Sequence, residues 1–277
     1  MHADGHTRVA GILGWPVEHS LSPAMHNAAF AELGLNWCYL PFPVPPERLA
    51  EAVRGLAAVG CAGLNVTIPH KRAVIALASS VSDAVAAIGA ANTLVPDGAG
   101  GFGADNTDAE GFLRALDDAA PLDLAGARVL VIGAGGAARA VAFAVRARGA
   151  VVVGSNRTAE RAAELADEVV PFERPALDAA AAESPLIVNA TSLGMGSDAV
   201  PPELPLDGVG PGQVAYDLVY RRGGTPWLHA CAARGAEVVD GLAMLLHQGA
   251  ASFVRWTGVE PPVDRMGAAL DGAGHAS

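Results

Sequence analysis

Short apolar runs alternate with helical segments along the first third of the chain. Each run is bounded by glycine, proline or polar residues, as is typical of a strand. Between the runs, apolar residues recur at helical spacing, and Ser22 followed by Pro23 predicts an N-cap with proline at the first helical position. The expected strands are Arg8–Gly14, Trp37–Phe42, Gly63–Ile68 and Asn92–Val95. This alternation predicts an α/β unit with a mostly parallel sheet.

A second alternating series begins near Arg128, after a turn-rich stretch at 98–103 that predicts a hairpin and a helix expected over 107–116. Its apolar runs are short and separated by helical segments, which favours a doubly wound domain. The later runs are Val151–Val153, Leu186–Asn189, Val214–Asp217 and Glu237–Val239. A long helical pattern follows Gly241, and the glycine- and alanine-rich tail from Pro261 is expected to be poorly ordered at its end.

The first apolar run of this second series, Val129–Ile132, leads directly into the glycine-rich turn Gly133–Gly136 and then into a helical segment. A strand, a tight turn and a helix N-terminus aim main-chain N–H groups at a pyrophosphate. At the end of the next strand, an NAD site usually carries an acidic residue for the ribose 2′-hydroxyl. This chain has Asn156 and Arg157 there, which suit a 2′-phosphate. The pattern predicts NADP as the cofactor.

Composition narrows the class of protein. Apolar residues make up 51% of the chain and charged residues 17%, so a sizeable core can form and the composition argues against disorder. The formal net charge is -11 without any block of basic residues, which argues against binding to nucleic acid or to an anionic membrane. Cys38, Cys61 and Cys231 show no metal-ligand or disulfide spacing. With no signal peptide or spanning apolar run, we expect a cytoplasmic protein without a metal site.

Motifs along most of the chain resemble those of the shikimate/quinate dehydrogenase family. In the first half they are G-W-P-V-E-H-S-L-S-P from Gly14, N-V-T-I-P-H-K from Asn65, G-A-A-N-T from Gly89 and D-N-T-D from Asp105. In the second half they are G-A-G-G-A from Gly133, N-R-T from Asn156, N-A-T-S-L-G-M from Asn189, Y-D-L-V-Y from Tyr216 and D-G-L-A-M from Asp240. The ordered set covers Val9 to Gly258, which is far more specific than a glycine motif alone. One departure is Arg222, where the family often has proline.

The resemblance implies two domains with a cleft between them. The substrate-binding and catalytic domain would comprise residues 1–106 and 242–277, because the C-terminal helix would return to the first domain. Residues 107–241 would form a Rossmann-type, doubly wound domain that binds NADP. The implied reaction is the NADP-dependent, reversible oxidation of shikimate to 3-dehydroshikimate, in the shikimate pathway to chorismate and the aromatic amino acids.

Within this resemblance, Lys71 and Asp108 are the candidate catalytic pair. The cofactor exchanges the hydride and the protein handles the proton. A free lysine has a pKa of about 10.4, whereas a general base working near neutrality needs a pKa of roughly 7–8. Burial and a nearby carboxylate would act on such a lysine in opposite directions. We expect Lys71 to accept the proton during oxidation, with Asp108 as its partner and as a substrate ligand. In the alternative, Lys71 mainly polarises the substrate oxygen while Asp108 orients it.

The resemblance also implies the binding residues. Ser20, Ser22 and Tyr220 would bind the substrate carboxylate through their hydroxyl groups. The residues expected at the ring hydroxyls of the substrate are Asn65, Thr67, Asn92, Asp108 and Gln248. The residues expected at the cofactor are Asp83, Gly133, Ala134, Gly135, Gly136, Ala137, Asn156, Arg157, Thr158, Arg161, Thr191, Leu218 and Gly241.

Two other functions remain open at the level of sequence. Quinate or aminoshikimate could replace shikimate as the substrate, although an NAD-preferring quinate enzyme would be expected to carry an acidic residue near Asn156. A noncatalytic NADP-binding regulator would be expected to lack Lys71 or Asp108, and both are present. No heptad seam or interface stripe indicates an oligomeric state, so monomer and homodimer both remain open.

Overall fold

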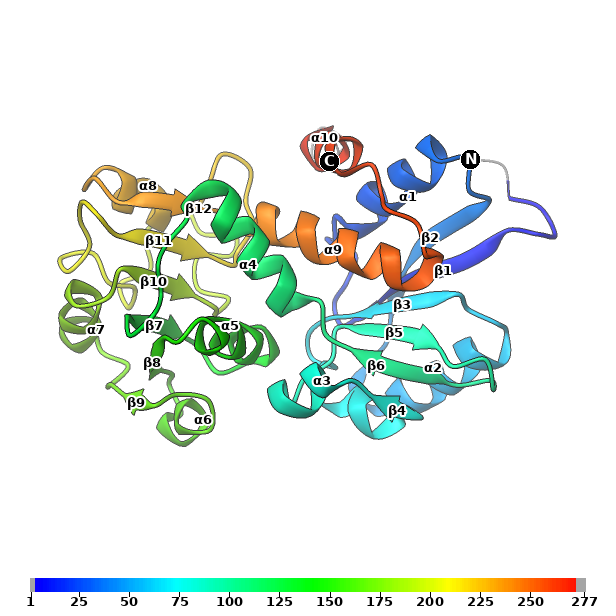
Figure 1. Cartoon of the computed structure of the whole chain (residues 1–277), viewed down its shortest axis with the longest axis horizontal. Coiled ribbons are helices and arrows are strands. Elements are labelled where there is room, and N and C mark those ends of the chain that lie inside the picture. The colour runs from blue at the N-terminus through cyan, green and yellow to red at the C-terminus, as the bar shows by residue number, and fades with distance from the viewer. Residues whose placement is uncertain (1–2, 273–277) are drawn as a thin grey trace. The chain divides into compact units, whose positions relative to one another are not determined.

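The computed structural model describes residues 3–272 and divides the chain into two compact units. Unit 1 comprises Met1–Asp108 and Leu245–Ser277, and unit 2 comprises Ala109–Met244. The chain passes from one unit to the other inside two helices, α4 (Asp108–Ala119) and α9 (Gly241–Thr257), which Figure 1 shows in green and orange. Unit 1 is therefore assembled from two stretches of sequence that lie far apart along the chain.

A six-stranded sheet forms the centre of unit 1, in the order β2-β1-β3-β5-β6-β4. Its strands are β1 (Arg8–Gly14), β2 (Trp37–Pro43), β3 (Gly63–Val66), β4 (Ser80–Val81), β5 (Thr93–Pro96) and β6 (Phe102–Asp105). β1 is parallel to β2 and β3, and β4 is parallel to β6. β5 is antiparallel to both of its neighbours, β3 and β6, and it forms the predicted hairpin with β6. The sheet is thus mixed, with parallel pairs in the majority.

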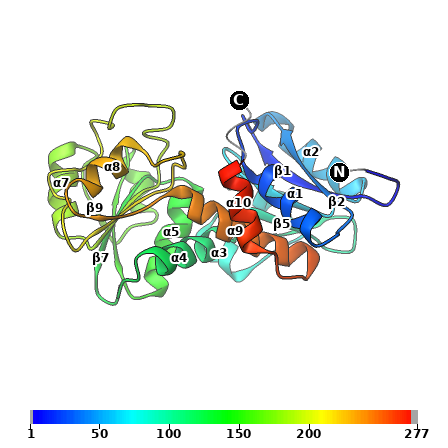
Figure 2. The same cartoon turned by 90° about the horizontal axis from the view of Figure 1, so that it is seen from above.

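Helices cover both faces of this sheet. On one face they are α1 (Ser22–Glu32), α9 and α10 (Val263–Gly272); on the other they are η1 (Pro46–Arg48), α2 (Leu49–Ala58), η2 (Ala73–Leu77) and α3 (Asp83–Ile88). Ile12 of β1 belongs to the first core and Leu13 to the second, because successive side chains of a strand point to opposite faces. α1 and α10 lie side by side, as Figures 1 and 2 show.

The sheet of unit 2 is parallel throughout, in the order β12-β11-β10-β7-β8-β9. Its strands are β7 (Arg128–Ile132), β8 (Val151–Ser155), β9 (Glu168–Val169), β10 (Leu186–Asn189), β11 (Val214–Asp217) and β12 (Glu237–Val239). From β7 the chain builds outward first to β9 and then, in the other direction, to β12. This is the doubly wound topology, in which ligands bind beyond the carboxyl ends of the strands where the order reverses. That point lies between β7 and β10.

Helices cover both faces of the second sheet as well. They are α4, α5 (Gly136–Ala147), α6 (Ala159–Ala163), α7 (Arg174–Ala182) and α8 (Pro226–Ala232). Phe112 of α4 stacks on Tyr216 of β11 with 4.8 Å between ring centres, whereas Leu177 of α7 and Trp227 of α8 share the core of the opposite face. Strand β7 is consequently buried along Val129–Ile132, which explains its uninterrupted apolar sequence.

One local expectation, the N-cap at Ser22, was wrong, and the elements β4, β9 and α10 were not predicted. The two-residue strands β4 and β9 were not predicted, because two residues are too few to show a hydrophobic period. The tail contains the helix α10, which buries Met266 and Leu270 despite its small residues; the last five residues of the tail lie outside the described part. Ser22 is the first residue of α1 and not its N-cap, because the main chain of Leu21 is already helical.

One histidine of unit 1 is completely enclosed by aromatic rings. His26 of α1 stacks on Tyr39 with 4.4 Å between ring centres, and Trp256 lies at 5.3 Å. The side chain has no exposed surface, and neither ring nitrogen has a hydrogen-bond partner within residues 3–272. Burial lowers the pKa of His26 to about 3, and the nearby Asn65 side chain opposes this shift only in part. His26 therefore serves as a neutral core residue.

This burial predicts an acid-sensitive stability. The unfolded chain binds a proton at His26 near pH 6.5, whereas the folded protein binds it only near pH 3. The contribution of His26 to the free energy of unfolding is therefore fully present above about pH 6.5. It falls as the pH drops, by up to roughly 1.4 kcal/mol per pH unit. The free energy of unfolding, measured with urea between about pH 4 and 8, should fall less steeply with decreasing pH in His26→Leu than in wild type. The control is His19→Gln at an exposed position, which should keep the pH dependence of the wild type. An equally steep loss of unfolding free energy at acid pH in His26→Leu would contradict the prediction.

Candidate active site

Lys71 and Asp108 form an ion pair in unit 1. Lys71 follows β3, and Asp108 is the first residue of α4. The distance between Lys71 Nζ and Asp108 Oδ2 is 2.6 Å, and only 15% and 5% of the two side chains is exposed. Lys71 is the only lysine of the chain. A single amine is thus held at a buried carboxylate.

Asn92 holds the second oxygen of that carboxylate. Its Nδ2 donates to Asp108 Oδ1 at 2.9 Å and to Gln248 Oε1 at 3.2 Å. The orientation of the Asn92 amide is set by the main-chain N–H of Thr107, which donates to Asn92 Oδ1 at 2.7 Å. An N–H can only donate, so the oxygen must face Thr107 and the nitrogen must face Asp108. The fold brings together Lys71, Asn92, Asp108 and Gln248 in this way.

Asn65 lies beside this group and is also almost fully satisfied. Its Oδ1 accepts from the Tyr39 hydroxyl at 2.7 Å, and its Nδ2 donates to the Asn92 carbonyl at 3.1 Å and to Ser252 Oγ at 3.0 Å. Only 4% of Asn65 is exposed. The amide therefore retains one lone pair on Oδ1 for an outside donor such as a hydroxyl group.

The remaining residues expected at the substrate have varied surroundings. Ser20 Oγ accepts from the main-chain N–H of Ser22 at 3.3 Å, which links the two predicted serines at the start of α1. Thr67 is half-buried, and its hydroxyl has no hydrogen-bond partner among residues 3–272. Tyr220 belongs to unit 2, whereas the two serines belong to unit 1; burial raises the pKa of Tyr220.

The glycine turn of unit 2 has the geometry that a pyrophosphate requires. Gly133 has φ of 114°, and a Cβ there would lie 2.7 Å from the Ala190 carbonyl oxygen, so this position needs glycine. Gly135 precedes the first residue of the helix α5, and a Cβ there would meet no atom within 4 Å. Open space beside main-chain N–H groups at the start of a helix suits an anion. The residues present therefore fit the diphosphate of a dinucleotide.

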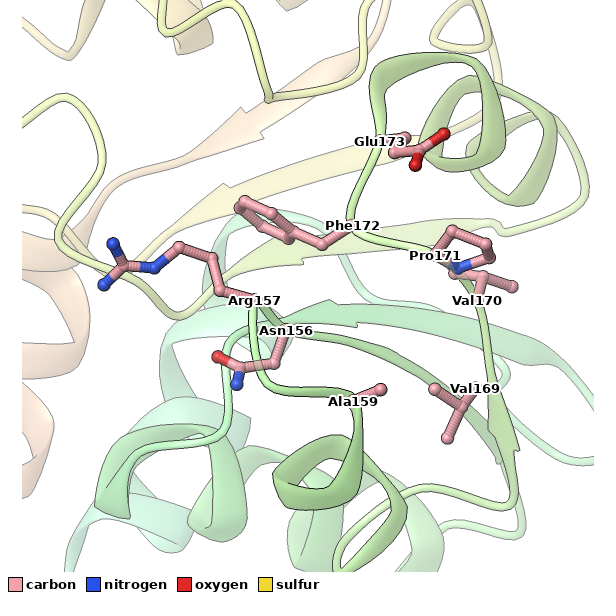
Figure 3. A pocket seen from close by; sticks show the side chains of 8 residues that line it. All are labelled: Asn156, Arg157, Ala159, Val169, Val170, Pro171, Phe172 and Glu173. Carbon is pink, nitrogen blue, oxygen red and sulfur yellow. The ribbon is translucent and has the colours of Figure 1, made fainter.

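Asn156 and Arg157 line an open cavity of about 510 Å³ beside the end of β8 (Figure 3). Arg157 is exposed and forms no ion pair with the described residues, and the same holds for Arg161. Other arginines of unit 2 are paired with carboxylates: Arg128, Arg139, Arg146, Arg148, Arg174 and Arg234. Arg157 thus remains free to bind an anion. Asn156 has a structural bond of its own, from Nδ2 to the Thr158 carbonyl at 2.9 Å.

Two other predicted cofactor residues, Thr191 and Gly241, have structural roles, and a third, Asp83, has none in the described contacts. The Thr191 hydroxyl donates to Asn189 Oδ1 at 2.6 Å and thereby closes the turn after β10. A Cβ on Gly241 would lie 2.6 Å from the Leu218 carbonyl oxygen, so close packing is sufficient reason for glycine there. Asp83, the first residue of α3, is an exposed residue of unit 1.

A buried acid that the sequence analysis missed joins the loops after β10 and β11. Asp217 accepts from Asn189 Nδ2 at 2.9 Å, from the Val219 N–H at 3.0 Å and from the Thr225 hydroxyl at 2.7 Å. Burial raises the pKa of Asp217 to about 6, and these three donors oppose the shift. The signal in the sequence was a polar residue at the end of each of two apolar strands, which could have indicated a paired contact between the carboxyl ends of β10 and β11.

Arg221, beside the unusual Arg222, also joins two loops of unit 2. Its guanidinium donates to the Ser197 carbonyl at 2.5 Å and to Asp198 Oδ1 at 2.6 Å. The loop after β11 is thus tied to the loop after β10 at a second place.

Comparison with known proteins identifies the family. The chain matches the family models described as "Shikimate dehydrogenase substrate binding domain" over residues 12–94, "Shikimate / quinate 5-dehydrogenase" over 115–193 and "Shikimate 5'-dehydrogenase C-terminal domain" over 241–270. It is 45% identical to the shikimate dehydrogenase (NADP(+)) of Methanopyrus kandleri, over 95% of this chain and 94% of that protein. The corresponding protein of Moorella thermoacetica is 46% identical, over 98% and 95%.

Solved structures agree with the sequence relatives. Shikimate dehydrogenase from Aquifex aeolicus has a TM-score of 0.90 at 37% identity, covering 97% of this chain and 99% of that one. The enzyme from Thermus thermophilus in complex with NADP(H) and shikimate has a TM-score of 0.83 at 39% identity, covering 96% and 100%. Identities of 45% and 46% over nearly the whole chain, together with the shared fold, show that this chain belongs to the shikimate dehydrogenase family.

Proposed function

We propose that this protein is an NADP-dependent shikimate dehydrogenase, which interconverts shikimate and 3-dehydroshikimate in the shikimate pathway. The observation that carries the proposal is the Lys71–Asp108 ion pair, in which the sole lysine of the chain is held 2.6 Å from a buried carboxylate. A noncatalytic NADP-binding protein has no need of such a pair. The relatives named NADP(+) shikimate dehydrogenase support the same substrate and cofactor.

Lys71 handles the proton in this proposal. When the ketone is reduced, the Lys71 ammonium donates a proton to the carbonyl oxygen; when the alcohol is oxidised, the neutral amine accepts the hydroxyl proton. Asp108 keeps Nζ in place through the 2.6 Å contact. NADP, when bound, supplies the hydride acceptor or donor. The protein contributes position and a proton carrier.

Substrate recognition is assigned to unit 1. Ser20, Ser22 and Thr67 provide hydroxyl groups, and Asn65, Asn92 and Gln248 provide amides whose orientations are fixed before the substrate arrives. Such preorganisation reduces the entropy lost on binding. Tyr220 of unit 2 is proposed as a further ligand of the substrate carboxylate.

The cofactor is assigned to unit 2. The turn Gly133–Ala137 would bind the diphosphate, and Arg157 with Asn156, Thr158 and Arg161 would surround the 2′-phosphate. Support comes from the open space at Gly135 and from the free guanidinium of Arg157. Asp83, Thr191, Leu218 and Gly241 remain proposed neighbours of the nicotinamide.

A cytoplasmic location belongs to the same proposal. Cys38, Cys61 and Cys231 are free thiols, which fits a reducing compartment. No helix among residues 3–272 is both long enough and apolar enough to cross a membrane.

The direct test is a comparison of substrates and cofactors. NADP and NAD reduction should be measured with shikimate and with quinate, and kcat/KM compared for the four pairs. We expect shikimate with NADP to give the highest value. Higher kcat/KM with quinate would assign the protein to the quinate branch of the family, and no turnover with any pair would favour a regulator.

Replacing either member of the catalytic pair should strongly lower kcat and preserve cofactor binding. Lys71→Ala and Asp108→Asn are each expected to lower kcat by about 100-fold or more, the usual contribution of a positioned proton carrier. Because the cofactor is assigned to unit 2, the Kd for NADP, measured by fluorescence titration, should change less than about twofold in the same variants. Near-normal turnover in Lys71→Ala would exclude the proposed role.

Removing the free arginine should affect one cofactor and not the other. Arg157→Ala is expected to raise the KM for NADP roughly 10- to 100-fold, since a charge-assisted hydrogen bond contributes about 1.5–3 kcal/mol. The KM for NAD, which lacks the phosphate, should stay within about twofold. Arg234→Ala is the matched control, because that arginine is paired with Asp207. Equal losses with both cofactors would refute a phosphate-binding role.

A further inference from the structure

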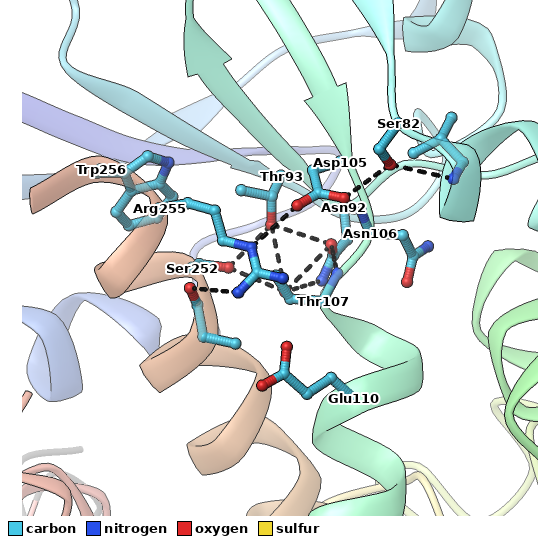
Figure 4. A network of polar contacts seen from close by, with 12 residues as sticks. Ser82, Asn92, Thr93, Asp105, Asn106, Thr107, Glu110, Ser252, Arg255 and Trp256 are labelled. Atoms are coloured by element: carbon cyan, nitrogen blue, oxygen red, sulfur yellow. Dashed lines mark hydrogen bonds and ion pairs between the residues drawn. The ribbon is translucent and has the colours of Figure 1, made fainter. Parts of the chain in front are cut away.

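Three hydroxyl groups lie in contact behind the proposed substrate amides. Ser252 Oγ lies 2.8 Å from Thr93 Oγ1 and 3.0 Å from Thr107 Oγ1, and the two threonine oxygens are 3.2 Å apart. None of the three residues has exposed surface, so water cannot replace a lost partner. We refer to Thr93, Thr107 and Ser252 as the hydroxyl cluster. Figure 4 shows Ser252 of α9 pointing into it beside Asn92.

Ser252 differs from its two neighbours because it lies on the helix α9 and contacts the Asn65 amide directly. Asn65 Nδ2, which can only donate, lies 3.0 Å from Ser252 Oγ, and the Gln248 carbonyl, which can only accept, lies at 3.0 Å on another side. A hydroxyl has one proton and two lone pairs. When Ser252 donates to Gln248 and accepts from Asn65, one lone pair remains for a neighbouring hydroxyl.

The other contacts fit this arrangement of protons. Each threonine hydroxyl can donate either to the remaining lone pair of Ser252 or to Asn92 Oδ1. Thr93 Oγ1 lies 2.8 Å from Ser252 Oγ and 3.0 Å from Asn92 Oδ1, and Thr107 Oγ1 lies 3.0 Å and 3.2 Å from the same two atoms. When one threonine donates to Ser252 and the other to Asn92, all three hydroxyl protons have acceptors, and Ser252 is the acceptor shared by Asn65 and one threonine. Fully satisfied buried networks of this kind restrict their members to one geometry.

We propose that Ser252 is a positioning residue of the active site, which holds Asn65 directly and Asn92 through Thr93 and Thr107. The inference rests on the proposed function, since that assigns both amides to the substrate. Asn92 in turn binds Asp108 Oδ1, so the effect of Ser252 extends to the carboxylate that holds Lys71. Ser252 itself touches neither the ion pair nor, in this proposal, the reacting atoms.

The test compares Ser252→Ala with a matched control on the same helix. Thr257 Oγ1 donates to the Phe253 carbonyl at 2.8 Å, the same contact to the preceding turn that Ser252 makes, and it lies outside the hydroxyl cluster. Ser252→Ala should fold, because Asn65 Nδ2 keeps the Asn92 carbonyl as an acceptor. We expect kcat for shikimate to fall about tenfold, with the KM for NADP within about twofold. Thr257→Ala should retain wild-type kcat.

A second readout does not depend on the substrate. Since Lys71 is the only lysine, protein labelled with lysine that carries ¹³C at Cε alone gives one lysine Cε signal. This signal should be displaced in Ser252→Ala and should coincide with wild type in Thr257→Ala. If wild-type protein fails to oxidise shikimate, the proposed function fails, and the lysine signal alone decides the role of Ser252.

The outcomes are distinct. Unchanged kcat in Ser252→Ala, at a temperature where circular dichroism shows the variant folded, overturns the proposal even if its melting temperature is lower, because Ser252 then only stabilises the fold. If the wild-type protein does not oxidise shikimate, an unchanged lysine signal in Ser252→Ala overturns the proposal. Reduced kcat together with a displaced signal supports a positioning role.

Discussion

The buried carboxylate of Asp108 is the group on which the organisation of unit 1 depends. With 5% of its side chain exposed, a carboxylate is costly unless both of its oxygens have partners. Lys71 satisfies one oxygen and Asn92 the other, at 2.6 and 2.9 Å. The contacts that offset the energetic cost of burying the Asp108 carboxylate also fix the orientations of the Lys71 amine and the Asn92 amide. Stability and chemistry therefore depend on the same three residues, so neither can be altered without the other.

This requirement extends to the C-terminal part of the chain. Gln248, Ser252 and Trp256 recur every four residues along α9, so they share one face of the helix. Gln248 accepts from Asn92, Ser252 joins the hydroxyl cluster, and Trp256 Nε1 donates to the Leu94 carbonyl at 3.1 Å. Trp256 also lies so close to β3 that a Cβ on Gly63 would be 2.3 Å from it. The position of α9 is thus set by hydrogen bonds and close packing together.

The proposed cofactor site of unit 2 relies instead on main-chain N–H groups and on an arginine without an ion-pair partner among the described residues. Gly133 has no room for a side chain, and Gly135 leaves open space at the start of α5. Asp217 and Thr225 fix the turns beyond β10 and β11 through buried hydrogen bonds. Arg157 forms no ion pair with the described residues, whereas many neighbouring arginines do. An anion can be bound by such a surface without displacing an existing partner, which avoids an energetic cost.

The sequence by itself determined the two alternating series, the parallel sheet of unit 2, the glycine turn and the motifs that identify the family. Those features are local, since strand period, turn chemistry and motif spacing are properties of neighbouring residues. Only the tertiary structure decided that Asp108 and Lys71 are in contact, that Asn65 and Asn92 are already satisfied, and that Ser252 joins them. These contacts connect residues separated by 15 to 187 positions, and no local pattern records such distances. Two-residue strands and the helix α10 escaped prediction for the same physical reason: they are stabilised by pairing or burial against distant segments.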